Sequence, residues 1–378
     1  MVFILNKNYY LKRGIPMLNK RFTLILAMLV LVIFAVGSVS AEENVTADID
    51  VPTEEVVIDE VDVDDDPVDD AVESEKVVEP TRLTTTYSIN NSYSSSAIDN
   101  LIDTGSSSNK VIINFANQTY SNIALDLTGN VNVELWGNGA TLNGDGTHDI
   151  FTVTNSHNIV IKDFIINVDS GAAAIYGHHV YDSVYTNNTI TGGKDGINIF
   201  QIHENLTITD NNISGFTRDG ISLVNFDTMN DTTWANFVAS NVSGNKITGG
   251  QYGMFFGGNY KGVISNNDIT GSGVGIEFAG KKAATNGRLD VELNYNTIVG
   301  VTTGISMNHP DVISFKMLNN TVNSTSNTTF AILAGNNFDV DDDAIISLIN
   351  NTFYGYTSSA FYYEITEDIN NTGLVRYP

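Results

Sequence analysis

Two short segments of the chain share one order of residues, a cation followed by Asp-Gly, and could carry acid–base chemistry. Lys194 and Asp195 stand in the first segment, and Arg218 and Asp219 stand in the second. If these segments lie in neighbouring turns of a repeat, the two aspartates stack about one strand spacing (~4.8 Å) apart. Two carboxylates that close can share a proton, and the flanking cations could hold a uronate, as acid sugar chemistry requires. The alternative, which we favour, is that Asp-Gly is a common turn pair whose cations only neutralise stacked acids.

Histidines and acidic loops offer a second kind of chemistry, metal binding. His178, His179 and His203 could lie on one side of neighbouring turns and ligate a metal ion. Residues 143–146 and 339–343 resemble calcium loops, but neither has the twelfth-position glutamate of an EF-hand. Because no regular ligand spacing is present, solvated turn histidines and ordinary loops are the better interpretation. The sequence therefore predicts no metal site and no cofactor.

Aromatic residues near turns are candidates for sugar binding, because sugar rings stack on exposed aromatic faces. Tyr176, Tyr181 and Tyr260 are the candidates that we single out. The same residue types also fill the core of a repeat protein, so for any one of them a core position is more common than a binding role.

Composition narrows the classes of function. The chain of 378 residues has no cysteine, which excludes a disulfide framework, a thiol nucleophile and a cysteine-based metal site. Its formal charge of −26 argues against nucleic acid as a partner, because phosphates are repelled by such a surface.

A repeat with two elements runs through most of the chain. The first element is apolar-x-x-Asn-x-apolar, and its asparagines are Asn188, Asn211, Asn245, Asn267, Asn296, Asn320 and Asn351. The second follows eight to eleven residues later as a small residue and a large apolar one: Gly196-Ile197, Gly220-Ile221, Gly253-Met254, Gly275-Ile276, Gly304-Ile305, Ala331-Ile332 and Ala360-Phe361. A weaker, earlier turn contains Val160, Asp163 and Ile165. Two elements that keep phase over seven turns indicate a solenoid.

The repeat predicts an all-β, single-stranded right-handed parallel β-helix with about three short strands in each turn. We expect the recurring asparagine at a tight left-handed turn, with its amide bonded to the asparagines above and below in a ladder. The small residue should mark a second close turn. Longer spacings predict inserted loops at 226–236, 280–288 and 337–343. Ser94 and the apolar residues after it predict a short helix that caps the first turn.

The chain before the solenoid divides into two parts. Residues 1–41 resemble a secretory signal, with Lys20 and Arg21 before an apolar run and small residues before Ala41. An uncleaved membrane anchor is the alternative, since Phe22 to Ala41 could just span a bilayer. Residues 42–80 contain 17 Asp or Glu against one Lys, which predicts a disordered acidic spacer. The β-helix should then occupy residues 83–378.

The chain resembles the right-handed β-helix repeat proteins, and most closely the adhesin-like surface proteins of methanogenic archaea. The resemblance covers about residues 83–378 and is carried by segments 125–130, 136–143 and 158–161 and by the repeats of the Asn-Asn-Thr-Ile type. It implies the fold strongly and the activity weakly, because β-helices also include pectate lyases, polygalacturonases and alginate epimerases. The Asn-Thr-Asp and Gly-His-Gly segments of polygalacturonases are not found in this sequence.

These features favour an exported, cell-surface or secreted adhesin-like protein that contacts glycans or other cells without catalysis. The expected partner is an extracellular polysaccharide or envelope glycan, with no nucleic acid involved. One alternative is a polysaccharide-active enzyme, a lyase, epimerase or hydrolase, that uses the two Asp-Gly segments. Another is a purely structural envelope protein. A lateral groove with convergent acids would favour the enzyme, whereas an adhesin can be flat.

Overall fold

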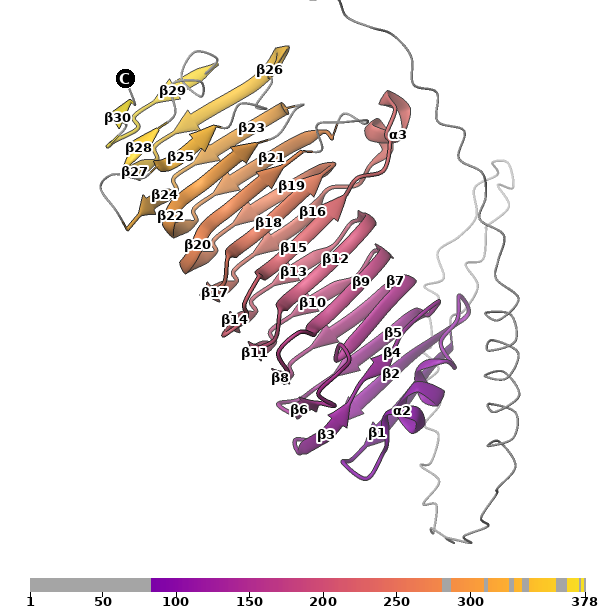
Figure 1. Cartoon of the computed structure of the whole chain (residues 1–378). Coiled ribbons are helices and arrows are strands. Elements are labelled where there is room, and N and C mark those ends of the chain that lie inside the picture. The colour runs from indigo at the N-terminus through magenta and orange to yellow at the C-terminus, as the bar shows by residue number, and fades with distance from the viewer. Residues whose placement is uncertain are drawn as a thin grey trace, which may run out of the picture. The chain divides into compact units, whose positions relative to one another are not determined.

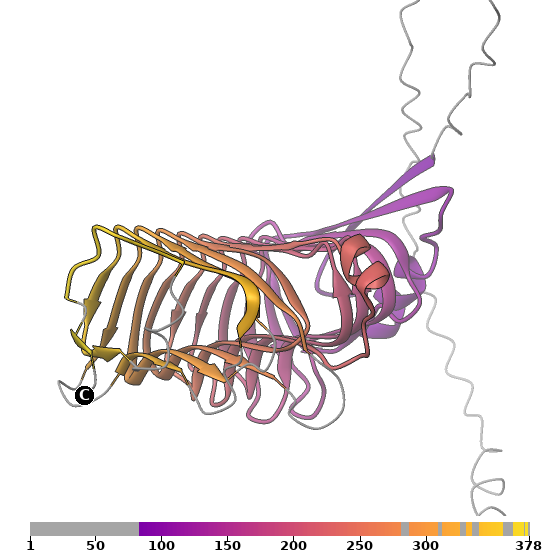
Figure 2. The same ribbon diagram turned by 90° about the horizontal axis from the view of Figure 1, so that it is seen from above.

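The computed structural model describes residues 83–280, 287–308, 312–325, 330–334, 340–357, 366–373 and 375–376. These residues form a right-handed parallel β-helix, in which each strand pairs in parallel with the equivalent strand of the turn before and the turn after. Figures 1 and 2 show the strands of successive turns side by side, from β1 at one end to β29 and β30 at the other. The predicted fold class is confirmed.

The strands line three faces of the solenoid. The first face contains β1 (Leu83–Ile89), β2 (Asn109–Phe115), β5 (Val131–Trp136), β10 (Val184–Thr186), β13 (Thr207–Thr209), β16 (Ser240–Ser243), β19 (Tyr260–Ser265), β21 (Leu289–Asn294), β23 (Val312–Leu318), β26 (Val340–Ile349) and β29 (Glu367–Ile369). The second face contains β3 (Thr119–Ile123), β6 (Thr141–Gly144), β8 (Ile165–Val168), β11 (Thr189–Gly192), β14 (Asn212–Ser214), β17 (Lys246–Thr248), β24 (Thr321–Ser324) and β27 (Thr352–Tyr354).

The third face carries the site described below. It contains β4 (Leu125–Asp126), β9 (Ala173–Tyr181), β12 (Asp195–Glu204), β15 (Asp219–Asn225), β18 (Tyr252–Gly258), β25 (Phe330–Ala334), β28 (Tyr356–Thr357) and β30 (Val375–Arg376). Three long strands turn a corner and serve two faces: β7 (Phe151–Lys162), β20 (Asp268–Ala279) and β22 (Thr297–Asn308).

The core consists of inward side chains that stack in columns along the solenoid. On the third face, Ile197 pairs with Ile221, which pairs with Met254, followed by Ile276 and Ile305, and all five are fully buried. Neighbouring residues alternate between the core and the surface, as the pleat of a strand requires. This alternation decides which residues of the third face point outward.

The seven asparagines of the repeat form one column at the corner between the first and second faces. Each side-chain Nδ2 donates to the Oδ1 of the next asparagine, from 3.1 Å between Asn188 and Asn211 to 2.9 Å between Asn320 and Asn351. The same Oδ1 accepts the backbone N–H of the previous asparagine, and Nδ2 also donates to a backbone carbonyl of the turn before. The column continues to Asn371, which the sequence analysis missed.

The left-handed backbone lies one residue before each asparagine of the column, so the prediction for the asparagine itself was wrong. Asn187, Asp210, Asn266 and Tyr295 have φ between 54° and 59°, whereas the asparagines that follow them do not have a positive φ. The turn therefore uses two residues: one takes the left-handed conformation and the next turns its amide inward to the ladder.

The glycines of the second repeat element are required by close packing and not by a turn. A Cβ on Gly220 would lie 2.6 Å from the carbonyl oxygen of Gly253, and one on Gly253 would lie 2.7 Å from that of Gly275. Both glycines lie inside strands, β15 and β18, and neither has a positive φ. The predicted second turn at these positions was therefore wrong.

The register also corrects two alignments made from the sequence. Val184 pairs with Val160 and Thr189 with Ile165, so Phe164, and not Asp163, occupies the ladder position before Asn188. Thr357 pairs with Ile332, the place that we had assigned to Phe361. Ala360 and Phe361 themselves lie outside the described residues.

Two helices accompany the strands. The predicted helix is α2 (Ser95–Ile102), with the Ser94 side chain accepting from the backbone of Ala97. Its role as a cap of the solenoid stays a prediction. Between β15 and β16 the chain leaves the coil, as the spacing predicted, and forms α3 (Asp231–Asn236), a helix where the sequence predicted only a loop.

Other predicted segments fall partly or wholly outside the described residues. The second loop includes 281–286, and the third includes 337–339, while residues 340–343 already belong to β26. The proposed signal segment and acidic spacer, 1–41 and 42–80, also lie outside. Among the residues that the structure describes, no helix has both the length and the apolar character needed to cross a membrane.

Candidate functional site

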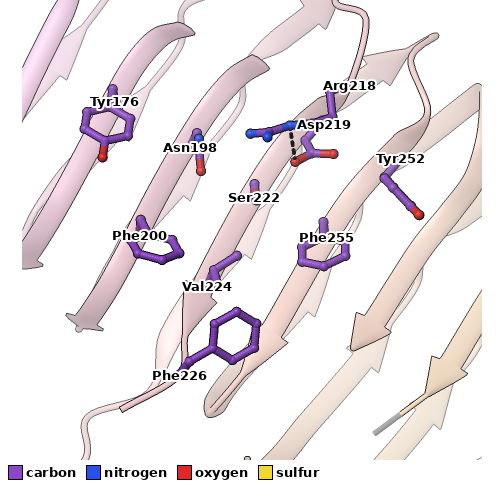
Figure 3. A pocket seen from close by; sticks show the side chains of 10 residues that line it. All are labelled: Tyr176, Asn198, Phe200, Arg218, Asp219, Ser222, Val224, Phe226, Tyr252 and Phe255. Carbon is purple, nitrogen blue, oxygen red and sulfur yellow. Dashed lines mark ion pairs between the residues drawn. The ribbon is translucent and has the colours of Figure 1, made fainter. Parts of the chain in front are cut away.

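A pocket with a volume of about 490 Å³ lies on the third face, over four neighbouring turns. Its floor consists of outward side chains of β9, β12, β15 and β18 (Figure 3). The lining residues are Tyr176, Asn198, Phe200, Arg218, Asp219, Ser222, Val224, Phe226, Tyr252 and Phe255. The pocket thus combines aromatic walls with a small group of polar side chains, as ligand sites commonly do.

Arg218 joins the two aspartates of the Asp-Gly segments. Asp195 pairs with Asp219 in the register of β12 and β15. The guanidinium of Arg218 donates from Nε to Asp195 Oδ1 at 2.8 Å and from Nη2 to Asp195 Oδ2 at 2.6 Å. The same Nε lies 3.2 Å from Asp219 Oδ2. Asp195 is therefore held by a bidentate ion pair, while Asp219 has only a single, longer contact to the arginine.

Asp219 is a buried carboxyl group with an unusual environment. Its side chain is 6% exposed, and its Oδ1 has no hydrogen-bond partner among the described residues. Figure 3 shows one carboxyl oxygen beside Arg218 and the other directed away from it. Burial and, to a smaller extent, the nearby Asp195 carboxylate together raise the pKa of Asp219 to about 6, against the opposing effects of Arg218, a side-chain hydrogen bond with Ser222 and Lys194. A carboxyl group with such a pKa can donate a proton near neutral pH.

Aromatic side chains form the rest of the pocket. Tyr176 comes from β9, Phe200 from β12, and Tyr252 and Phe255 from β18, whose rings meet edge to face at 5.3 Å. Phe226 comes from the inserted segment that leads to α3. Such faces can pack against the apolar faces of sugar rings.

A second carboxyl group with a raised pKa lies next to this pocket. Glu277 on β20 pairs with Phe255 in the register, and Ser306 of the following turn pairs with Glu277. Burial raises the pKa of Glu277 to about 7. Burial raises the pKa of Tyr252, and the charges of Glu277 and Asp219 both act in the same direction.

The candidate residues from the sequence are placed as follows. Arg218 and Asp219 line the pocket; Asp195 lies beneath it, 4% exposed, and Lys194 is exposed and is not part of the lining. Of the three tyrosines, Tyr176 lines the pocket and Tyr181 does not. Tyr260 is 1% exposed in the core, which contradicts its candidacy as a sugar platform.

The predicted metal candidates do not come together. His178 and His179 are neighbours, with ring centroids 4.2 Å apart, but His203 is buried and its Nδ1 lies 3.0 Å from the Gln201 carbonyl oxygen. The Asp145 side chain accepts bonds from the backbone of Thr147 and His148, which makes an ordinary Asx turn. Within the described residues, no group of three or more His, Asp or Glu side chains could hold a metal ion. The segment 339–343 is described only in part, as backbone from Val340.

Sequence reasoning missed most of the pocket wall. Asn198 and Ser222, which it missed, share one outward column with Phe255, one of the aromatic residues near turns that the sequence does point to, because each directly follows the inward apolar residue of the second repeat element. That position could have been read from the aligned repeats. Phe226 could not, because it belongs to an insertion that has no equivalent in the neighbouring turns.

Comparisons with known proteins yield similar solved structures only. No protein-family model and no curated protein sequence matches the chain. The A-module of the mannuronan C-5 epimerase AlgE6 of Azotobacter vinelandii aligns with a TM-score of 0.49 and 14% identity, over 75% of this chain and 95% of that chain. A polygalacturonase from Erwinia carotovora ssp. carotovora gives 0.43 and 12%, over 82% and 96%.

The catalytic domain of a GH87 alpha-1,3-glucanase in complex with nigerose aligns with a TM-score of 0.43 and 14% identity, over 81% of this chain and 68% of that chain. At these scores and identities, the function of the pocket has to be argued from its own residues. The comparisons give no support to the resemblance to adhesin-like surface proteins.

Proposed function

We propose that the protein is a polysaccharide-active enzyme that binds a glycan chain in the pocket of the third face and uses Asp219 as its proton donor. A single observation carries the proposal: a buried carboxyl oxygen that has no hydrogen-bond partner among the described residues belongs to a residue that lines an aromatic pocket. A buried carboxyl that lacks a full set of partners is disfavoured in its charged form and kept as an acid. Such an acid can protonate the oxygen that leaves when the glycosidic bond breaks, while water forms the new bond to the anomeric carbon and releases its own proton to solvent.

The non-enzymatic adhesin, our first interpretation of the sequence, is less well supported by this site. A surface that only contacts glycans has no need for a buried, partly unpaired carboxyl, which costs stability when it ionises. The aromatic lining alone would serve binding in either case. The combination of that lining with Asp219 therefore favours the enzyme.

Location outside the cytoplasm is part of the same proposal. A signal-like segment at 1–41 and an acidic segment at 42–80 precede the β-helix in the sequence. Export would bring the pocket to extracellular or envelope polysaccharides, which are its expected substrates.

The test is turnover of polysaccharides by the native protein and by Asp219→Asn, measured as new reducing ends. We expect the substitution to lower the rate by about 10²–10⁴-fold, the usual contribution of a positioned acid. Because the protonated form of Asp219 is the active one, the rate of the native protein should fall as the pH rises through about 6.

The matched control is Asp268→Asn, which removes the same charge from an exposed position on the second face and should leave turnover unchanged. A native protein that binds glycans but releases no new ends would contradict the enzyme and return the adhesin to first place. Turnover that survives in Asp219→Asn would remove Asp219 from the mechanism.

A further inference from the structure

We infer that the pocket takes an uncharged sugar chain and excludes uronate polymers. The inference rests on the proposed function, because it names the substrate class of the same pocket. It reverses the expectation from the sequence that the cations beside the two aspartates could hold a uronate. Three features of the described residues support it.

The first feature is that the pocket's cation is already occupied. Arg218 is the only Lys or Arg among the lining residues. Its Nε and Nη2 bind both oxygens of Asp195, and Nε also faces Asp219 Oδ2 at 3.2 Å. The Nε–Nη2 edge of the guanidinium, which could otherwise bind a sugar carboxylate in a bidentate way, is therefore used by the protein's own carboxyl groups, and only the Nη1 side is left for a ligand.

The second feature is the local balance of charge. One guanidinium serves the carboxyl groups of Asp195 and Asp219, and Glu277 lies one strand beyond Phe255. A uronate would add a further carboxylate to this group, in a partly buried place where like charges repel strongly. Lys194 is exposed and does not line the pocket, and its effect on Asp219 is smaller than the opposing effect of Asp195.

The third feature is that the remaining polar groups suit hydroxyl groups. Asn198 donates from Nδ2 to Asp195 Oδ2 at 3.3 Å, which leaves its amide oxygen directed to the Phe200 side of the pocket (Figure 3). Ser222, whose side chain is bonded to that of Asp219, places its hydroxyl oxygen between Asn198 and Phe255 in the register. An amide oxygen and a hydroxyl group, set among aromatic faces, can bind sugar hydroxyls without requiring a charge on the ligand.

The experiment measures binding of the full chain at pH 7 and low salt by isothermal titration calorimetry and affinity electrophoresis. The probes are mannan, a β-glucan and a galactan as uncharged chains, and alginate and polygalacturonate as uronate polymers. We expect at least one uncharged chain to bind at least about tenfold more tightly than either uronate polymer.

Asp195→Asn supplies a gain-of-binding test. It releases Arg218 from its bidentate partner, so binding of alginate or polygalacturonate should increase by about tenfold or more over the native protein. Asp219→Asn keeps the bidentate pair and removes the carboxyl that lines the pocket, and it should also gain affinity for uronates. It serves as the second variant if Asp195→Asn fails to fold, as judged by circular dichroism. Asp268→Asn, with the same change of net charge, should show no gain.

The outcomes separate this inference from the proposed function. Tight binding of uronates by the native protein overturns the inference. It is also overturned if Asp195→Asn and Asp219→Asn, like Asp268→Asn, show no gain in affinity for uronates. Binding of an uncharged chain without any turnover supports the inference and rejects Asp219 as a catalyst. If the native protein turns over a uronate polymer and Asp219→Asn does not, the proposed function is supported and the inference is rejected. If none of the five polymers binds, both proposals fail.

Discussion

Each asparagine of the ladder satisfies every polar group that it brings into the solenoid. Asn267 is 2% exposed; its Oδ1 accepts the backbone N–H and the side-chain Nδ2 of Asn245 at 2.9 and 3.0 Å. Its Nδ2 donates to the Val242 carbonyl and to Asn296 Oδ1, both at 2.9 Å. A buried amide is therefore tolerated here because the turns above and below complete its hydrogen bonds.

Asn267→Ala should destabilise the protein by about 3 kcal/mol, because each buried group left without a partner costs about 1–3 kcal/mol. The Asn245 amide, its backbone N–H and the Val242 carbonyl all lose a partner. Chemical denaturation gives the free energy of unfolding. The control is Asn212→Ala at an exposed position of β14, for which we expect a change of less than about 0.5 kcal/mol. Equal effects of the two substitutions would show that the ladder adds no stability.

Asp195 and Asp219 differ in their environment because Arg218 binds them unequally. Asp195 receives two short hydrogen bonds from Arg218, whereas Asp219 has one longer contact and an oxygen without a partner among the described residues. The bidentate pair fixes the position of the Asp195 side chain, and burial favours the acid form of Asp219. The stacked pair thus separates into a structural partner of Arg218 and a candidate proton donor.

At the scale of the strand, the third face is built on a column of small residues. The glycines of β12, β15, β18, β20 and β22 allow the chain to pass close to the carbonyl of the next turn, and Ala331 ends the column in β25. This close approach fixes the start of each strand and therefore the positions of Asp195, Asp219 and Tyr252, which precede or begin the strands.

Gly253→Ala should cost about 1–3 kcal/mol, because overpacking forces backbone or side chains to move. The added Cβ would lie 2.2 Å from Ile269 Cγ2 and 2.7 Å from the Gly275 carbonyl oxygen. Thermal unfolding should show the loss, and glycan binding should weaken as Tyr252 shifts. Gly249→Ala is the comparison: its Cβ meets nothing within 4 Å, so it should cost only the left-handed strain of about 1 kcal/mol. A smaller loss at Gly253 than at Gly249 would contradict the packing argument.

The inserted segment between β15 and β16 contributes a part of the pocket wall that the regular turns of the solenoid do not contain. Trp234 of α3 stacks on Phe237 at 5.6 Å, and Asp231 pairs with Arg288 at 2.5 Å. The Asp227 carbonyl accepts from Asn259 Nδ2 at 2.7 Å. These contacts hold the segment that contributes Phe226 to the pocket wall.

At the scale of the whole molecule, stability depends on buried groups that titrate in opposite directions. Burial lowers the pKa of His203 to about 4 and raises those of Asp219 and Glu277 to about 6 and 7. The two carboxyl groups stabilise the fold fully only below their unfolded pKa, and this contribution is lost as the pH rises through 6 and 7. His203, which is buried in its neutral form, contributes stability at higher pH, and this contribution is lost as the pH falls towards 4.

His203 should make the solenoid sensitive to acid. Between pH 6.5 and pH 4 the unfolded chain binds the imidazole proton more strongly, so acidification over this range costs about 3 kcal/mol of unfolding free energy. His203→Leu removes this term and keeps both carboxyl groups. Its unfolding free energy, measured by denaturant titration at each pH, should fall less than that of the native protein. If the unfolding free energies of the two proteins depend on pH in the same way, the pKa of His203 does not differ between the folded and unfolded states, and the prediction is wrong.

The sequence by itself determined the order of the turns and the columns within them. The phase of the two repeat elements placed seven asparagines in one column and Asp195 beside Asp219, because stacked turns keep the same coil, with extra residues in inserted loops, and so bring equivalent positions together. The alternation of β19 also contained the answer for Tyr260: it lies four residues before the buried Ile264, and so on the inward side.

Only the tertiary structure decided what the side chains do at those positions. Arg218 reaches back to the preceding turn and binds Asp195 more closely than its own neighbour Asp219, a choice that depends on the space between two strands. A register shift between Phe200 and His203 turns His203 into the core, since a one-residue change reverses inside and outside in a strand. The pocket joins four turns and an insertion, so its shape is a property of their packing and of no single repeat.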